Sequence, residues 1–331
     1  MRKLSRRTFL RAGAAVTVTS FAGATLPGTA YAQSSPFPAR PVTVLVPYAA
    51  GGNTDTLARL ACQFLSKRLG QNFVVENLPT AGGVVATETL SRAEKDGHTL
   101  MFGAETTIVI MPLMQNLNYS VDDIAPLSAL AAGTYILATR KSLGLTTLAE
   151  FVAYAKENPG KLNYAVGSIG GNTHLSMARF AKLTEIELEK IPYPGGGPAT
   201  AALLAGEVDA YFGNASELLK LASNPEIVLL AVSSAERLKQ APDLPTVAEF
   251  LPSFVARTWN GFMAPAGLPA DVVETIVNAT IEASKDPEIR ERMEVLGITP
   301  LGTTQAELLA MIEEDKAFYT EAVEIAGLSK R

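Results

Sequence analysis

Cysteine and histidine, the residues that most often bind transition metals, are almost missing from this sequence. Its 331 residues include one cysteine, Cys62, and two histidines, His98 and His174. Neither histidine has a His or Cys partner at metal-ligand spacing, so we expect no metal ion. A lone cysteine excludes an internal disulfide. Because Cys62 lies on the apolar face of a predicted helix, Asp55–Leu69, we expect its thiol to be buried and unreactive.

The motifs of common enzyme classes are missing too. The sequence has no G-x-G-x-x-G opening a helix, no G-x-x-x-x-G-K-[ST] phosphate loop and no G-x-S-x-G nucleophile elbow. Gly167 and Ser168 are adjacent, with no residue between them, and no pair of carboxylates stands out. We therefore expect no cofactor and no catalytic residues.

Charge is scarce and its balance is acidic. Charged residues make up 18% of the chain and apolar residues 47%, with a formal net charge of −5. This composition predicts a packed core. An acidic chain binds nucleic acid poorly, because phosphate neutralisation needs clustered Lys and Arg. Beyond residue 32 no segment approaches the ~18 consecutive apolar residues of a membrane-spanning helix.

Residues 1–32 have the order of an export signal. The pair Arg6-Arg7 is followed by Phe9-Leu10, an uncharged run over Ala12–Ala30, and the small-x-small pattern Ala30-Tyr31-Ala32. This order resembles a twin-arginine signal peptide. The alternative is a short membrane helix, which the Gly, Thr, Ser and Pro in the run disfavour. We expect export to the periplasm and a mature chain that begins near Gln33, with a formal net charge of −10.

Short apolar, β-branched runs alternate with helical segments along the rest of the chain, which predicts an α/β fold with mostly parallel sheets. The predicted strands are Val42–Val46, Phe73–Glu76, Thr99–Phe102, Tyr135–Thr139, Asn163–Val166, Leu188–Ile191, Val208–Phe212, Ile227–Val232 and Phe262–Ala264. The predicted helices are Asp55–Leu69, Val84–Ala93, Leu148–Glu157, His174–Leu183 and Pro198–Ala205, and after Ala264 only helices, Ala270–Ser284, Pro287–Leu296 and Thr304–Ala326.

Four turns of small residues follow predicted strands and precede helices. They are Ala50–Asp55, Ala81–Gly83, Gly167–Thr173 and Pro194–Gly197. Ligands of α/β sheets bind outside the carboxyl ends of the strands. Free N–H groups and the positive end of the helix dipole attract anions there. One such turn alone is an ordinary connection; the four together predict a carboxylate pocket built mainly from backbone amides.

The residues of these turns also carry a family resemblance. The chain resembles the Bug-type solute-binding proteins, the extracytoplasmic receptors of tripartite tricarboxylate transporters. The resemblance runs from about Pro36 to the C-terminus. It rests on Val44–Asp55, Val74–Asn77 with Ala81–Gly83, Asp96–Leu100, Pro159–Ala165, Thr173–Leu175, Ile191–Tyr193, Gly206–Asp209 and Leu244–Glu249.

The resemblance implies a two-lobed periplasmic binding protein fold, with a parallel-rich sheet in each lobe and a ligand cleft between them. We expect residues 36–135 and 259–331 to form lobe one, and residues 136–258 to form lobe two. The chain would cross between the lobes near Ala132–Ile136 and Arg257–Gly261. The implied function is to capture a small organic acid that has two or three carboxylate groups or an aromatic ring.

The implied partners are integral membrane transporter subunits, with a sensor kinase as another recipient, and the implied state is a monomer. An exported enzyme acting on a small carboxylic acid is the alternative function, because twin-arginine export often serves cofactor-loaded enzymes.

The resemblance also implies ligand-binding residues. In lobe one they are Tyr48, Ala50, Gly52, Asn53, Asp55, Ala81 and Gly82. In lobe two they are Ser168, Gly170, Asn172 and Thr173, with Tyr193 and Pro194 on the wall and Asn214 after the fourth strand. Some of these residues have a structural interpretation as well. Tyr48 and Tyr193 suit a core, and Asp55 suits a helix cap. We expect Trp259 to be packed and His174 to make a local structural hydrogen bond.

The chain departs from the family pattern at four places. It has Tyr48-Ala49 for Phe-Pro, Leu78 for Arg, Ala104-Glu105 for a small polar residue, and Gly213-Asn214 for Asp-Asn. Glu105 is a further candidate ligand-binding residue, because in the cleft it would repel a second carboxylate or recruit a cationic group. We expect Glu105 to face solvent instead, as acids at helix starts commonly do. The identity of the carboxylate stays open.

Overall fold

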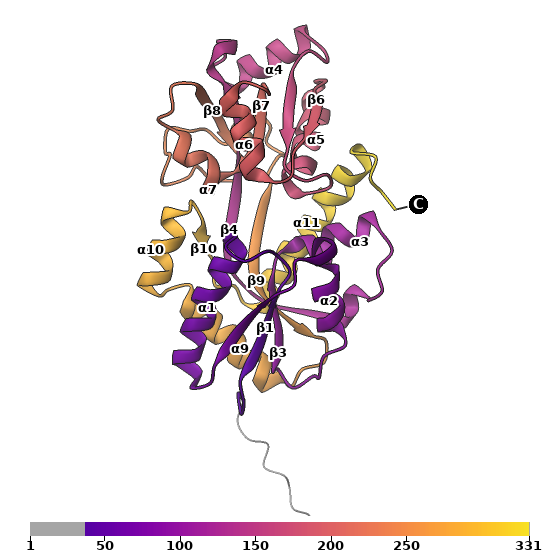
Figure 1. Cartoon of the computed structure of the whole chain (residues 1–331), viewed down its shortest axis with the longest axis vertical. Helices are drawn as coiled ribbons and strands as arrows, with labels where there is room; N and C mark the ends of the chain where they lie inside the picture. Colours follow the sequence, from indigo (N-terminus) through magenta and orange to yellow (C-terminus); the bar gives the residue numbers. More distant parts are fainter. Residues whose placement is uncertain (1–36, 331) are drawn as a thin grey trace, which may run out of the picture. The chain divides into compact units, whose positions relative to one another are not determined.

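Two long antiparallel strands, β4 (Ile124–Arg140) and β9 (Arg257–Pro265), run through the centre of the structure (Figure 1). The structure is a computed structural model that describes residues 37–330. The predicted signal peptide and cleavage site lie outside these residues. Within this range no helix is both long and apolar enough to cross a bilayer.

The first sheet is built on a parallel trio in the order β2 (Phe73–Asn77), β1 (Val42–Val46), β3 (Thr99–Gly103). Strand β3 pairs antiparallel with β9, which pairs with the first part of β4 from Ile124 to Thr134. A two-residue strand, β10 (Thr299–Pro300), joins at Ala131 and Ala132. The helices of this part are α1 (Asn53–Leu69), α2 (Val84–Ser91), α3 (Met111–Met114), α9 (Ala270–Ala283), α10 (Pro287–Val295) and α11 (Gln305–Ile325), with the π-helix η2 (Thr106–Ile110).

The second sheet begins where β4 changes partners. From Tyr135 onward β4 pairs antiparallel with β7 (Ala210–Asn214) and β8 (Ile227–Val232). Strand β7 then pairs parallel with β5 (Asn163–Val166), which pairs with β6 (Glu189–Pro192). The helices here are α4 (Leu148–Glu157), α5 (Asn172–Thr184), α6 (Gly196–Ala205), α7 (Ala215–Leu218) and α8 (Val247–Phe250).

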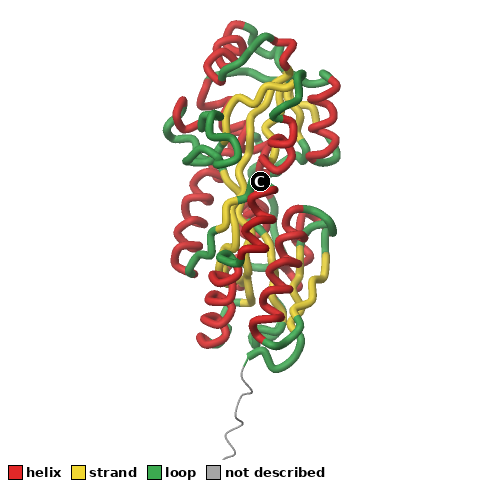
Figure 2. The backbone as a smooth tube through the Cα atoms, turned by 90° about the vertical axis from the view of Figure 1, so that its left-hand side faces the viewer, coloured by secondary structure: helices red, strands yellow, loops and turns green. Residues whose placement is uncertain are grey.

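Helices flank the strands of both sheets (Figure 2). Their apolar side chains pack with those of the strands in shared cores. In the first sheet the fully buried Phe102 and Phe262 rings meet edge-to-face, with centroids 5.0 Å apart. In the second sheet Phe212, Phe180 and Phe254 form the aromatic part of the core.

The long helix α11 contacts both sheet regions. Phe318, on α11, packs against the core of the second sheet and against a core cluster of the first. Arg179, on α5, lies 4.5 Å from the centroid of the Phe318 ring, and its Nε donates to Glu321 Oε2 on α11 at 2.6 Å. The C-terminal helix therefore ties α5 to the rest of the molecule.

The α/β fold predicted from the sequence is confirmed, with each parallel trio extended into a mixed sheet by the long central strands. Three expectations were wrong. β9 starts at Arg257 and not at Phe262, because its first part is mostly polar and lacks an apolar run. β4 starts at Ile124 and not at Tyr135, because its Ala-rich first part has no alternating pattern. After Ala264 the chain also forms β10, which is only two residues long and carries no strand signal.

Candidate functional site

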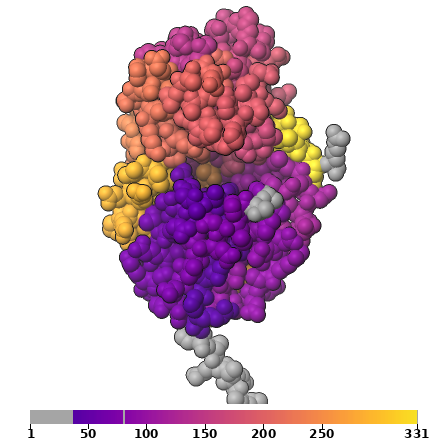
Figure 3. Space-filling model, viewed as in Figure 1, coloured from indigo at the N-terminus to yellow at the C-terminus, as the bar shows by residue number. Residues whose placement is uncertain are grey.

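A cavity of about 510 Å³ lies between the two sheet regions. Figure 3 shows a recess at this level of the surface, where the N-terminal segment meets the middle of the chain. The predicted residues that line the cavity are Tyr48, Gly52, Asn53, Ser168, Asn172, Thr173 and Asn214. Turns that are more than a hundred residues apart in the sequence thus converge on one space.

Three helices begin at this cavity without a side-chain cap. The residues before α1, α5 and α6 are Gly52, Gly171 and Gly195, and among the described residues no side chain caps these helix starts. Some helices elsewhere in the chain do have a side-chain cap: Thr147, Thr246 and Thr304 each form a capping box. At the cavity, the first N–H groups of each helix are therefore left for a ligand or for water.

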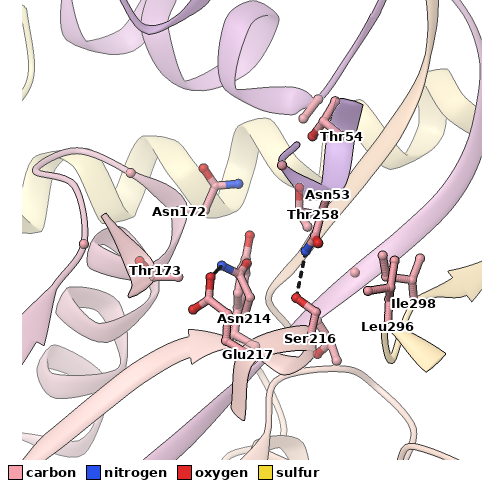
Figure 4. A pocket seen from close by; sticks show the side chains of 18 of the residues that line it. Asn53, Thr54, Asn172, Thr173, Asn214, Ser216, Glu217, Thr258, Leu296 and Ile298 are labelled. Atoms are coloured by element: carbon pink, nitrogen blue, oxygen red, sulfur yellow. Dashed lines mark hydrogen bonds between the residues drawn. The ribbon is translucent and has the colours of Figure 1, made fainter. Parts of the chain in front are cut away.

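Hydrogen bonds cross the cavity between the two sheet regions. Asn53, at the start of α1, donates from Nδ2 to Ser216 Oγ at 2.7 Å (Figure 4). Thr106 Oγ1 donates to Asn172 Oδ1 at 3.2 Å. Asn172 Nδ2 in turn donates to Glu105 Oε1. Polar side chains at the starts of α1 and α5 thus contact the opposite side of the cavity.

Glu105 is fully buried, so the expectation that it faces solvent was wrong. Besides the bond from Asn172, its Oε2 accepts from Thr258 Oγ1 and from the Trp259 backbone N–H, both at 3.1 Å. Burial, reinforced by the negative charge of Asp315, raises the pKa of Glu105 to about 8. The position of Glu105 near a helix start suggested exposure to solvent. Its burial could not be predicted locally, because all three of its hydrogen-bond donors lie at least 67 residues away in the sequence.

Trp259 and Asp315 form the layer behind Glu105. Trp259 is fully buried, as expected for a packing residue, and its Nε1 donates to Asp315 Oδ2 at 2.9 Å. Burial raises the pKa of Asp315 to about 6, although Arg257, 3.4 Å away, opposes the rise. This layer lies next to Thr258 and Asn260, which line the cavity.

Several residues that were predicted to contact the ligand do not line the cavity, as far as the structure describes it. They are Ala50, Asp55, Gly82, Glu105, Gly170, Tyr193 and Pro194. Ala81, in the short helix η1 (Thr80–Gly83), stays a prediction. In the turn before α6, Gly195 and Gly196 line the cavity in place of Tyr193 and Pro194. Tyr193 is half-buried against the core of the second sheet.

Asp55 supports the first turn from behind. Its Oδ2 accepts from the Gly51 N–H at 2.8 Å and from Arg59 Nε at 3.0 Å, and its Oδ1 accepts from Asn77 Nδ2 at 2.9 Å. Burial acts to raise the pKa of Asp55, but these hydrogen bonds and the Arg59 charge outweigh it and lower the pKa. The expected helix cap was wrong, since Gly52 is the residue at the cap position.

Gly170 is needed for the shape of its turn. Its φ of 75° lies in the left-handed region, and an added Cβ would collide with the Met114 side chain. Its N–H donates to His174 Nδ1 at 3.0 Å, which confirms His174 as a local structural partner. Burial, followed by the charge of Lys190, lowers the pKa of His174 to about 4. Cys62 is buried as expected, and burial raises the pKa of its thiol to about 12.

Other lining residues were missed from the sequence. They include Thr106, Gly133, Tyr211, Ser216, Glu217, Lys220, Thr258, Asn260 and the segment Leu296–Ile298. The segment after β7 had a usable signal, because Asn214 was already placed at the carboxyl end of a strand. Leu296–Ile298 comes from the turn between α10 and β10 and had none.

The comparisons with known proteins agree with this geometry. A family model described as tripartite tricarboxylate transporter family receptor matches residues 57–328. The chain belongs to this receptor family. The receptor is 32% identical over 295 residues to the protein BugT of Bordetella pertussis, a match that covers 88% of this chain and 90% of BugT. The Bug-type resemblance is thereby confirmed.

Two solved structures place the receptor among ligand-bound proteins of the same fold. One is a protein of R. palustris with adipate, at 29% identity and a TM-score of 0.77, covering 88% of this chain and 99% of that one. The other is MatC from Rhodopseudomonas palustris with bound malate, at 31% identity and a TM-score of 0.73, covering 87% and 100%. These similarities confirm the two-lobed periplasmic binding protein fold.

Proposed function

We propose that the receptor binds a small organic carboxylate in this cavity and delivers it to the membrane subunits of a tripartite tricarboxylate-type transporter. The family supports this function, as do the adipate and malate in two similar proteins. The observation that carries it is the convergence of the uncapped starts of α1 and α5 on one cavity. Such starts attract anions through free N–H groups and the helix dipole.

One ligand carboxylate is held between the starts of α1 and α5. Asn53 offers an amide there, and Ser168 and Thr173 offer hydroxyl donors, all from the lining of the cavity. Tyr48 forms part of the wall. Hydrogen bonds to a carboxylate are charge-assisted and stronger than neutral ones. Glycines at the turns let the ligand approach the backbone closely.

The lobes meet at the point where β4 changes partners. Residues 36–135 with 259–331 form lobe one, and residues 136–258 form lobe two. The change of pairing between Thr134 and Tyr135 supports the first crossing. The pairing of Gly133 with Thr258 supports a second crossing nearby. The lobes close on the ligand by a hinge at these positions.

The location and state of the receptor belong to the same proposal. The paired arginines, apolar run and cleavage pattern of residues 1–32 support export to the periplasm by the twin-arginine route. The receptor works there as a monomer and has no enzyme activity.

A thermal-shift screen with mono-, di- and tricarboxylates tests the function. A ligand that binds only the folded state raises the melting temperature in a concentration-dependent way. Each acid that shifts the melting temperature is then incubated with the receptor and quantified over time. Saturable binding with the acid unchanged supports the receptor; consumption of the acid contradicts it, and so does the lack of any shift across the panel.

A further inference from the structure

Glu217 places a negative charge on the wall of the cavity. It belongs to α7, after β7, and in Figure 4 it lies beside Asn214. Its Oε1 accepts from Asn214 Nδ2 at 3.1 Å, and its Oε2 accepts from the Tyr211 hydroxyl at 3.4 Å. The bond from Tyr211 is long, and both bonds come from neutral groups. A carboxylate offers about four acceptor positions, so Glu217 keeps capacity for a further donor.

No cationic side chain of the described residues forms an ion pair with Glu217. Lys220 lies three residues away and also lines the cavity, but it is exposed. A half-buried carboxylate that faces a ligand cavity without a cationic side-chain partner can gain a charge-assisted hydrogen bond from a ligand cation.

Glu217 also lies next to the start of helix α6. A methyl group on the Gly196 Cα, at the first residue of α6, would lie 2.5 Å from Glu217 Oε1 and 2.7 Å from Oε2. The carboxylate is thus packed against the backbone where α6 begins. The positive end of the α6 dipole already faces a negative charge of the protein there, which leaves the starts of α1 and α5 for a ligand carboxylate.

The formal charges of the lining residues also favour a positively charged ligand group next to Glu217. Glu217 and Lys220 are the charged side chains among the described lining residues, and their formal charges cancel. Asn260, 6% exposed, adds an acceptor: with its amide as oriented, Oδ1 has no hydrogen-bond partner within the described part of the chain. A second ligand carboxylate next to Glu217 would meet a like charge at short range, whereas an ammonium would meet an opposite one.

We propose that Glu217 determines specificity: the receptor prefers a carboxylate that carries an ammonium group at its other end over the dicarboxylate of matched length. The preference rests on the proposed function, since the starts of α1 and α5 hold the first carboxylate. The ammonium donates to Glu217 and gives it the cationic partner that the protein does not.

Calorimetry with matched ligand pairs tests this specificity. The pairs are succinate with 4-aminobutanoate, glutarate with 5-aminopentanoate, and adipate with 6-aminohexanoate. The wild-type receptor should bind the amino acid of at least one pair tenfold or more tightly than its dicarboxylate. Glu217→Gln should reduce this ratio by tenfold or more. Glu226→Gln, at an exposed acid outside the lining of the cavity, should leave the ratio unchanged.

Glu217→Asp keeps the charge and should keep the preference, which covers the case in which Glu217→Gln does not fold. Wild-type preference for the dicarboxylate in every pair, or an unchanged ratio in a folded Glu217→Gln, overturns the role of Glu217 while leaving the receptor function intact. Failure of both ligand classes to bind, when other carboxylates do bind, overturns the specificity. Failure of every carboxylate overturns the proposed function as well.

Discussion

Asn53 Nδ2 and Ser216 Oγ, 2.7 Å apart, join the start of α1 to α7 across the cavity (Figure 4). The two residues are 163 positions apart, and each lies beside a proposed ligand contact. Because the bond forms only when the two sides are close, it stabilises the same arrangement that a ligand touching both sides requires.

Replacing Ser216 by alanine should weaken ligand binding. The loss of one neutral hydrogen bond costs about 1 kcal/mol, or roughly a fivefold increase in Kd. Calorimetry with any acid that shifts the melting temperature measures this change. Ser142→Ala is the control, because Ser142 bonds only to Arg140 on the exposed surface. Equal affinities of both variants would show that the Asn53–Ser216 bond does not contribute to the bound state.

Stability should fall as the pH rises from about 6.5 to about 8. The pKa of Glu105 is raised from 4.5 to about 8 in the folded protein, so folding favours its protonated form. Its contribution is fully present below the unfolded-state pKa and is lost as the pH rises through about 8. At lower pH the raised pKa of Asp315, about 6, acts in the same direction, but the lowered pKa of His174, about 4, acts in the opposite direction up to about pH 6.5. Urea unfolding at a series of pH values measures the effect.

Glu105→Gln should flatten this dependence above pH 6, because the amide does not titrate. Glu324→Gln, at an exposed position of α11, should keep the wild-type slope. A Glu105→Gln protein whose free energy of unfolding changes with pH like the wild type would refute the buried, protonated state of Glu105.

Gly170→Ala should destabilise the receptor more than Gly144→Ala. Both glycines have left-handed backbones, with φ of 75° and 74°. Each substitution therefore carries a similar conformational cost of about 1–2 kcal/mol. At Gly144 the described residues leave open space around the added Cβ, whereas at Gly170 it collides with Met114. Because the end of the Met114 side chain must move to another rotamer, the contact adds about 0.5–1.5 kcal/mol at Gly170. Equal unfolding free energies for the two variants would contradict the packing of Met114 on this turn.

Export should depend on the paired arginines. Replacing Arg6 and Arg7 by lysine keeps the charge but removes the feature that a twin-arginine receptor reads. The precursor should then stay uncleaved in the cytoplasm, which cell fractionation and immunoblotting detect. Wild-type amounts of mature protein in the periplasm would mean that the general secretory route is sufficient.

Local patterns predicted the short buried elements of this fold well. Strands β5 (Asn163–Val166) and β8 (Ile227–Val232) and helix α4 (Leu148–Glu157) have the residues expected for them. Each has a clear apolar pattern bounded by turn residues. The π-helix Thr106–Ile110 was not recognised, because a run of β-branched residues carries no helical period.

The site was predictable where it depends on turns and unpredictable where it depends on long-range contacts. Glycine turns at strand ends placed Gly52, Ser168 and Thr173 around one cavity. The burial of Glu105 follows from Trp259 and Thr258, which lie more than 150 residues away. No local pattern reports such a contact, and the same holds for the Leu296–Ile298 edge of the cavity.

The most direct test of the carboxylate site is calorimetry on Ser168→Ala and Thr173→Ala, with Ser142→Ala as the remote control. If the starts of α1 and α5 hold the carboxylate, loss of one hydroxyl removes a charge-assisted hydrogen bond. Each cavity variant should then bind about ten- to a hundred-fold more weakly, which corresponds to about 1.5–3 kcal/mol. The unliganded variants should melt like the wild type, because Ser168 is exposed and Thr173 half-buried. If both cavity variants fold normally and bind as tightly as the Ser142 control, the ligand carboxylate does not lie at this turn.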